Sequence, residues 1–275
     1  MDVDRVRAYY ANLGEREWSR LDGPSGALEF AVNARTIQRY LPPSARILDI
    51  GGGPGRYTIW LAELGHRVVL ADLSPELVAI ANARIRSSRV ASTIEAAVEA
   101  DVRDLSAWQD DEFDAALSLG PFYHLTEPKD REQAASELHR VVRPGGKVFV
   151  AFMPRYAFLR RTAAIAQERH RLMDPRFVER LLNDGVFLND QPGRFDAGYG
   201  VMPSEIAPFF ERQGFETIQV LASEGLGSGI EDVVSELRET DPATYERLMD
   251  VITQCAADLS VHGLTTHLLY VGAVK

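Results

Sequence analysis

The stretch LDIGGGPGRYT, residues 48–58, contains the residues whose type and spacing most clearly indicate chemistry. Gly51, Gly53 and Gly55 alternate with other residues, and the acidic Asp49 precedes them. A turn rich in glycine lets the backbone come close to a ligand, because no side chain stands in the way. We therefore predict that this loop binds a ligand.

Two classes of ligand compete for such a loop. The dinucleotide fingerprint has the spacing G-x-G-x-x-G, whereas this chain has G-x-G-x-G, with Arg at position 56. Asp72 follows about 20 residues later, as an acidic residue does in that fingerprint. Its carboxylate could accept hydrogen bonds from ribose hydroxyls in either class, so Asp72 alone does not choose between them.

The elements around the loop alternate between strand and helix. We predict strands at 45–50, 66–74, 112–120 and 147–153, another ending near Ala100, and helices at 58–65, from Ser74 onward and at 128–143. Pro144-Gly145-Gly146 is predicted to be a turn. This alternation predicts βαβ units and a parallel sheet, whose ligands bind beyond the carboxyl ends of the strands.

The remaining segments frame this α/β core. We predict one helical run over 3–40, two helices and a loop from 154 to about 200, a helix at 204–213, a strand at 215–223, helical residues at 229–259 and a last strand at 266–275. The expected division is an N-terminal helical arm or lid (1–44), a cofactor-binding core (45–153), a cap insertion on the substrate side (154–203) and the remainder of the core (204–275).

Further motifs follow in a fixed order. Asp101 lies in EADVRDL after the third strand, SLGPFYHL follows the fourth, and RPGG precedes the fifth. Together with DxGxGxG and Asp72, this order resembles the class I S-adenosylmethionine-dependent methyltransferases over roughly residues 40–153, with a weaker similarity in the last two strands. The resemblance implies a Rossmann-like, seven-stranded, mostly parallel sheet with helices on both faces and an antiparallel last strand.

The resemblance also implies S-adenosyl-L-methionine as cofactor and S-adenosyl-L-homocysteine as product. The three glycines would pass the methionine part, Asp49 would organise the loop, Asp72 would bind the ribose, and Asp101 with Val102 would bind the adenine. The other residues assigned to the cofactor are Tyr10, Arg20, Tyr57, Leu73, Ser118 and Leu119. Arg20 would pair with the cofactor carboxylate under the closed arm. In the alternative reading the arm only packs its aromatic residues on the core, and Asp101 only forms a turn.

Methyl transfer from a sulfonium requires alignment and exclusion of water, and a base only where the acceptor must lose a proton. His124 is the candidate base and Tyr123 a second catalytic candidate, although either could serve packing or positioning. Phe122, Phe195 and Tyr199 are assigned to the substrate, which would be planar or apolar. Phe195 and Tyr199 lie in the glycine-rich stretch GRFDAGYG, residues 193–200, and could equally form a hydrophobic plug. We predict no metal site.

Other charged residues receive weaker predictions. Arg155, Arg160, Arg161, Arg169, His170 and Arg171 form a local basic run. Such runs are usually solvated helix faces, and an anionic substrate is the alternative. His262 and His267 flank the last strand, and His267 is interpreted as structural.

The composition limits the class of protein. The net charge of −10 argues against a nucleic-acid partner. The single cysteine, Cys255, excludes an internal disulfide and suits a reducing, cytoplasmic setting. The N-terminus has no apolar signal core, and no stretch has the ~20 apolar residues of a membrane span. The sequence leaves a homodimer open.

We therefore predict methyl transfer to a small molecule, with an aromatic or indole-type natural product as the expected acceptor. Whether carbon, nitrogen or oxygen accepts the methyl group stays open. A nucleotide-dependent oxidoreductase is disfavoured because no Tyr-x-x-x-Lys pair is found. An RNA or protein methyltransferase is disfavoured because the Asn-Pro-Pro-Tyr type motif is missing. A non-catalytic protein that binds the cofactor stays an alternative.

Overall fold

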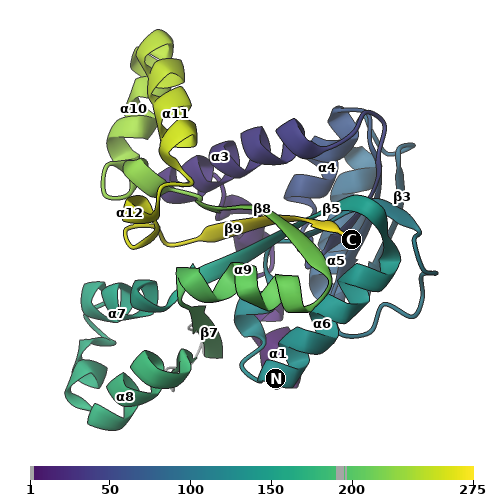
Figure 1. Ribbon diagram of the computed structural model, residues 1–275. Helices are drawn as coiled ribbons and strands as arrows, with labels where there is room; N and C mark the ends of the chain where they lie inside the picture. The colour runs from purple at the N-terminus through teal and green to yellow at the C-terminus, as the bar shows by residue number, and fades with distance from the viewer. Residues whose placement is uncertain (1–2, 190–194, 196) are drawn as a thin grey trace.

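A mixed sheet forms the centre of the molecule (Figure 1). The computed structural model describes residues 3–189, 195 and 197–275. Seven strands are hydrogen-bonded in the order β3-β2-β1-β4-β5-β9-β8, and the first five are parallel. They are β1 (Arg46–Ile50), β2 (Arg67–Asp72), β3 (Ile94–Glu99), β4 (Phe113–Ser118), β5 (Val142–Pro154), β8 (Phe215–Ala222) and β9 (Leu268–Val274). β9 lies antiparallel between β5 and β8, which confirms the predicted fold class.

Helices cover both faces of the sheet. Along β1, Leu48 and Ile50 enter one core and Ile47 enters the other, because successive side chains of a strand point to opposite faces. The first core contains α6 (Pro128–Val141) and α9 (Pro203–Arg212). The second contains α3 (Pro24–Tyr40), α4 (Arg56–Glu63), α5 (Pro75–Ser87), α10 (Glu231–Thr240) and α11 (Pro242–Cys255).

The N-terminal arm consists of three helices, where one run was expected. They are α1 (Val3–Leu13), α2 (Glu15–Ser19) and α3. Gly14 has φ +49, a conformation that glycine adopts readily and that ends α1. Pro24 starts α3 at its first turn, where a missing N–H costs no hydrogen bond.

The insertion contains a hairpin that the sequence reading missed. After α7 (Arg155–Ala164), the 3₁₀ turn η2 (Arg169–Met173) and α8 (Pro175–Asp184), β6 (Val186–Leu188) pairs with β7 (Ala197–Val201). β7 also pairs in parallel with the end of β5, where Met153 lies opposite Gly200. These segments share a small core of four residues, Phe158, Phe177, Leu181 and Phe187.

Two other boundaries differ from expectation. The Pro144-Gly145-Gly146 turn belongs to β5 as an irregular stretch, because the register to β4 shifts between Phe113 and Ala115. The helical run at 229–259 is broken at Asp241, whose side chain accepts a hydrogen bond from the Thr244 N–H and caps α11. The short α12 (Leu259–His262) follows.

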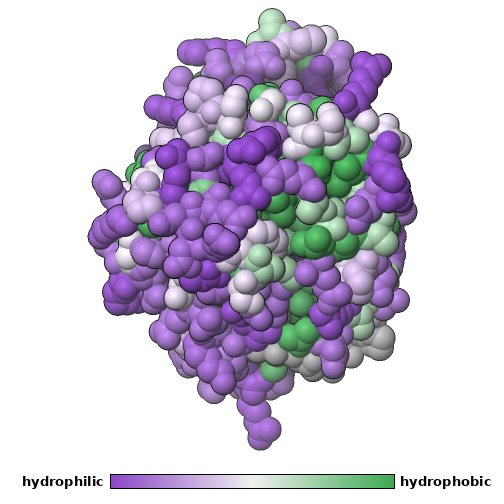
Figure 2. Space-filling view, turned by 90° about the vertical axis from the view of Figure 1, so that its right-hand side faces the viewer, coloured by the Kyte–Doolittle hydropathy of each residue, from purple (hydrophilic) through white to green (hydrophobic). Residues whose placement is uncertain are grey.

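The mean hydropathy of the chain is −0.15, and its surface is correspondingly polar (Figure 2). Within the described ranges, no helix is both long and apolar enough to cross a membrane. The face in Figure 2 is mainly hydrophilic, with hydrophobic residues gathered in a narrower band. The four-segment division of the chain stays a prediction.

Candidate active site

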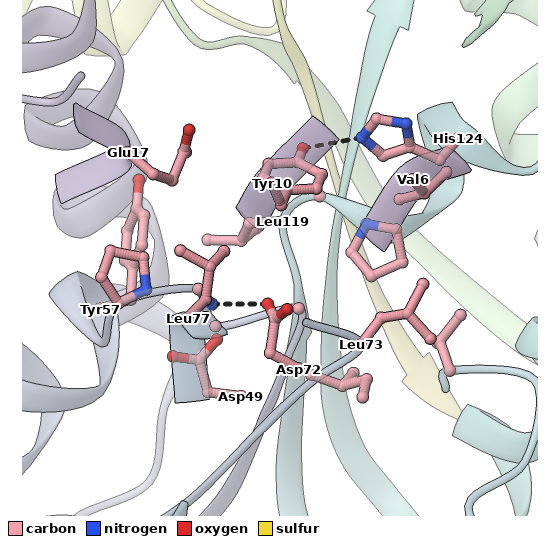
Figure 3. A pocket seen from close by; sticks show the side chains of 18 of the residues that line it. Val6, Tyr10, Glu17, Asp49, Tyr57, Asp72, Leu73, Leu77, Leu119 and His124 are labelled. Carbon is pink, nitrogen blue, oxygen red and sulfur yellow. Dashed lines mark hydrogen bonds between the residues drawn. The ribbon is translucent and has the colours of Figure 1, made fainter. Parts of the chain in front are cut away.

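A cavity lies at the carboxyl ends of the parallel strands, beneath the arm (Figure 3). Its walls come from α1, α2, the glycine loop after β1, and the loops after β2, β3 and β4. The predicted cofactor residues that line it are Tyr10, Arg20, Asp49, Gly51, Gly53, Tyr57, Asp72, Leu73, Asp101, Val102 and Leu119. Tyr123 and His124 line it as well.

The glycine loop has the conformation that its composition indicates. Gly51 has φ +77, and a Cβ atom there would lie 2.5 Å from Cδ of Pro121. Gly53 has φ +55, and its N–H donates to Oδ2 of Asp72 at 2.8 Å. Gly55 starts α4 with φ +95, and a Cβ would lie 3.7 Å from that of Ala81. Gly55 therefore serves the packing of α4 and does not line the cavity.

Two buried carboxylates form the floor of the cavity (Figure 3). Asp72 also accepts the Ser74 N–H at 2.8 Å. Burial raises the pKa of Asp72 to about 6, although these backbone hydrogen bonds oppose the rise. Asp49 accepts the Thr58 hydroxyl at 2.6 Å. Burial, and then the nearby charge of Asp72, raise its pKa to about 6 against that hydrogen bond.

The side of the cavity assigned to adenine contains an ion pair. Asp101 lies 2.6 Å from the Arg103 guanidinium and also accepts the Arg103 N–H. This Asp-turn is the local role that the sequence reading held as its alternative. Val102 is buried beside it and lines the cavity, so the adenine assignment of both residues stays a prediction.

The arm closes the cavity through three polar contacts, made by Tyr10 and Arg20. The Tyr10 hydroxyl is hydrogen-bonded to Nε2 of His124 at 2.8 Å, and Figure 3 shows both rings across from Asp72. Arg20 pairs at 2.9 Å with both Glu17 and Glu29. These contacts link α1 and α2 to the 3₁₀ turn η1 (Pro121–His124) and to α3.

His124 is a weaker base than its type suggests. Burial lowers its pKa to about 4, so the imidazole is neutral at pH 7 and its Nε2 is occupied by Tyr10. Burial likewise raises the pKa of Tyr123, which keeps this phenol protonated. The catalytic assignments of His124 and Tyr123 stay predictions.

Besides Gly55, three predicted site residues lie outside the cavity, and another lies beside it. Phe122 is fully buried against Phe152 and Phe210, which corrects its expected place at the substrate. Tyr199 lies under Arg131 and lines a separate pocket, so its assignment to the substrate stays a prediction. The Ser118 side chain is sealed in the core. Phe195 faces His124 with ring centroids 5.0 Å apart.

Several cavity residues were not predicted from the sequence. Glu17, Leu21, Arg56, Leu77 and Pro121 line the cavity. The position of Glu17 could have been predicted, because it precedes Arg20 by three residues and such a spacing places two side chains on one helical face, where they pair. The basic run of the insertion lies elsewhere. Arg155 binds the Gly200 carbonyl and Arg161 pairs with Glu168, so these residues hold the insertion together.

The charges of the cavity suit a cationic ligand. Four carboxylates line it, from Glu17, Asp49, Asp72 and Asp101, against the two guanidinium groups of Arg20 and Arg56. This excess of negative charge in a largely buried site favours a positive sulfonium over a pyrophosphate, which a dinucleotide would bring. The residues present therefore fit S-adenosylmethionine.

Comparison with known proteins agrees with the predicted family. A methyltransferase domain model matches residues 48–150. The ubiquinone biosynthesis O-methyltransferase of Xanthomonas axonopodis pv. citri is 32% identical over 181 residues, which cover 64% of this chain and 69% of that protein. That of Xanthomonas oryzae pv. oryzae is 33% identical over 150 residues, 53% of this chain and 59% of the relative.

Solved structures show the same fold. An S-adenosylmethionine-dependent methyltransferase of Methanosarcina mazei has a TM-score of 0.60 at 18% identity, covering 87% of this chain and 96% of that one. The 1,6-didemethyltoxoflavin-N1-methyltransferase of Burkholderia thailandensis, solved with its substrate and S-adenosylhomocysteine, has a TM-score of 0.57 at 16% identity, covering 98% and 87%.

The chain belongs to the class I S-adenosylmethionine-dependent methyltransferases. Its cofactor is S-adenosyl-L-methionine, which supplies an electrophilic methyl group when bound. The predictions of family, fold, enzyme class and cofactor are thereby confirmed.

Proposed function

We propose that this methyltransferase acts on a small, planar acceptor, and that the accepting atom is a phenolic oxygen. The observation that carries the proposal is a cluster of five rings where the arm meets the loop after β4. Tyr9, Tyr10, Tyr123, His124 and Phe195 have neighbouring ring centroids between 5.0 and 6.4 Å apart. Such rings favour a flat apolar molecule.

Two further observations support the proposal. The arm folds over the cavity and is held there by Tyr10 and Arg20. A covered cavity suits a small metabolite better than a macromolecule. Oxygen is chosen as the accepting atom because the Xanthomonas relatives carry the name O-methyltransferase. The indole-type acceptor is the second candidate, since the toxoflavin enzyme, which has a similar fold, is an N-methyltransferase by name.

The test is methyl transfer from trideuteromethyl-labelled S-adenosylmethionine to catechol, to indole and to a pool of transfer RNA, followed by mass spectrometry. We expect labelled catechol. Label on indole alone would move the accepting atom to nitrogen or carbon, and label on RNA alone would overturn the small-molecule proposal. Tight binding of S-adenosylhomocysteine without any transfer would favour a non-catalytic protein.

A further inference from the structure

A second group of buried charged residues lies beside the cavity, at the same edge of the sheet. Glu224 follows β8, which runs parallel to β5, and His267 directly precedes the antiparallel β9. Both are therefore at the edge where the parallel strands end and where ligands of such sheets bind. Glu29, on α3, faces the same group.

The two carboxylates face one nitrogen of the imidazole. Nδ1 of His267 lies 2.9 Å from Oε1 of Glu224 and 3.5 Å from Oε2 of Glu29. Glu224 is held in turn by the hydroxyls of Thr265 and Thr266 and by the backbone N–H groups of Thr266 and His267. This arrangement keeps a proton on Nδ1, so the neutral ring presents its lone pair on Nε2.

The other nitrogen is open. Among the described residues, Nε2 of His267 makes no hydrogen bond. It is also not one of the fully buried side-chain nitrogen and oxygen atoms that lack a partner, so it is accessible. The side chain retains 18% exposure, although the carboxyl group that orients it retains 1%. Its ring faces that of Tyr123, a cavity residue, at a centroid separation of 6.3 Å.

A histidine with one nitrogen on a buried carboxylate and the other open is a common general-base arrangement. We propose that His267, oriented by Glu224, is the catalytic base that takes the proton of the acceptor hydroxyl. The inference rests on the proposed phenolic acceptor. It assigns the proton to His267 in place of His124, whose Nε2 is already bonded to Tyr10.

The proton transfer balances without a further reagent. The O–H bond of the acceptor breaks, its proton goes to Nε2, and its electron pair forms the bond to the transferred methyl group. The carbon–sulfur electron pair stays on the sulfur of the product, and His267 then returns its proton to water. The ligand atoms of the same three side chains lie within 4.8 Å of one another, close enough for a metal ion. Glu224 already accepts hydrogen bonds from at least four donors, which compete with a metal for its lone pairs.

The surrounding charges raise the pKa of His267. Burial lowers its pKa, but the carboxylates of Glu29 and Glu224 outweigh burial and Arg20 opposes them, and the net shift is upward from 6.5. Burial raises the pKa of Glu224, and its contacts with His267, Thr265 and Thr266 bring it down to about 2. Glu224 is thus ionised throughout, and Tyr123 is protonated. A base must be neutral, so the rate of methyl transfer is expected to rise with pH through a value above 6.5.

The activity test compares two acceptors of different acidity. Catechol needs a base at neutral pH, whereas 4-nitrocatechol is already ionised and does not. For His267→Asn we expect kcat with catechol to fall by roughly 10²–10⁴, the usual contribution of a general base, and kcat with 4-nitrocatechol by less than about tenfold. Added imidazole should restore part of the catechol activity. His170→Asn, an exposed histidine of the insertion, is the matched control.

Equal losses with the two acceptors in His267→Asn would overturn the proposal, as would a loss confined to catechol in His124→Ala. Affinity for S-adenosylhomocysteine, measured by calorimetry, should be unchanged in His267→Asn, which separates proton transfer from damage to the cofactor site.

A second readout does not depend on turnover. In ¹⁵N-histidine NMR of the wild-type protein, assigned with His267→Asn, the neutral His267 ring should carry its proton on Nδ1, and its Nε2 signal should shift when catechol is added with S-adenosylhomocysteine. A proton on Nε2, or no shift with catechol, would overturn the proposal even if neither acceptor is methylated. Failure of both acceptors with these NMR signatures intact would instead count against the phenolic acceptor.

Discussion

At the scale of single residues, we expect cofactor binding to depend most on Asp72, which lines the cavity. Its two oxygens already hold the N–H groups of Gly53 and Ser74, so the side chain is rigid before any ligand arrives. We expect Asp72→Ala to weaken S-adenosylhomocysteine binding at least about 100-fold, because buried partners lose a charged acceptor. Isothermal titration calorimetry measures this, with NAD as a second ligand. The exposed Asp110→Ala is the control.

Circular dichroism should show that Asp72→Ala is folded. Wild-type affinity in this variant would contradict the placement of the ribose. Binding of NAD by the wild-type protein would revive the dinucleotide reading of the glycine loop.

The raised pKa of Asp72 also predicts a pH dependence. A carboxyl group with a folded-state pKa of about 6 accepts ribose hydrogen bonds as an anion only above that pH. Lowering the pH from 7.5 to 5 should therefore weaken S-adenosylhomocysteine binding roughly tenfold, the fraction ionised one pH unit below the pKa. Calorimetry at both values measures it.

The stability of the unliganded protein should change with pH in the opposite direction to cofactor binding. Asp49 and Asp72 have folded-state pKa values raised from 3.8 to about 6. Their stabilising contribution to the unliganded protein is present below about pH 4 and is lost as the pH rises through 6.

For the binding prediction, an affinity for S-adenosylhomocysteine that strengthens from pH 7.5 to 5 would contradict the assignment of an ionised Asp72.

At the scale of elements, the close contact of α3 with the residues after α2 sets the position of α1 and α2, the first two helices of the arm. A Cβ on Gly26 would lie 2.2 Å from the Arg20 carbonyl oxygen and 2.9 Å from Cα of Leu21, both backbone atoms. We expect Gly26→Ala to displace the arm, weaken S-adenosylhomocysteine binding about tenfold and speed proteolysis of residues 3–23. Calorimetry and limited trypsin digestion measure the two effects.

Gly23→Ala is the matched control for the arm, because its Cβ would lie 4.0 Å from the same carbonyl oxygen. It should change stability by less than about 1 kcal/mol, the range for a helix cap. Equal effects of the two substitutions would show that the loss of glycine itself, and not arm displacement, is responsible.

At the scale of the whole molecule, an aromatic stack ties α9 to the inserted last strand. The rings of Phe210 and Tyr270 are stacked with centroids 4.0 Å apart, and both residues are fully buried. Phe210→Ala should lower the free energy of unfolding by about 3–5 kcal/mol through the cavity it leaves, and the melting temperature by roughly 10 °C. Differential scanning calorimetry measures this.

Leu259→Ala, at a position 79% exposed, is the control and should leave the melting temperature nearly unchanged. A small effect of Phe210→Ala would mean that the stack contributes little to the core on this face of the sheet. The cofactor site, on another part of the sheet, should keep its affinity in either variant.

The fold was largely predictable because its signals are local. The strands at 46–50 and 67–72 are short apolar runs, and the proline and serine at the start of α5 are read directly from the chain. The break at Gly14 and the pairing of β6 with β7 were missed. The first depends on one dihedral angle, and the second depends on a partner strand that the local pattern does not name.

The sequence by itself determined the class of enzyme, because the loop at 49–55, Asp72, Asp101, the stretch after the fourth strand and the PGG turn follow one another in the order typical of that class. Only the tertiary structure decided which aromatic and titratable residues meet the cavity. It buried Phe122 in the core, sealed His124 against Tyr10, and brought Glu224, His267 and Glu29 together across up to 238 positions (267 minus 29). The physical reason is that burial and long-range contact set pKa values and orientation, and neither is encoded in neighbouring residues.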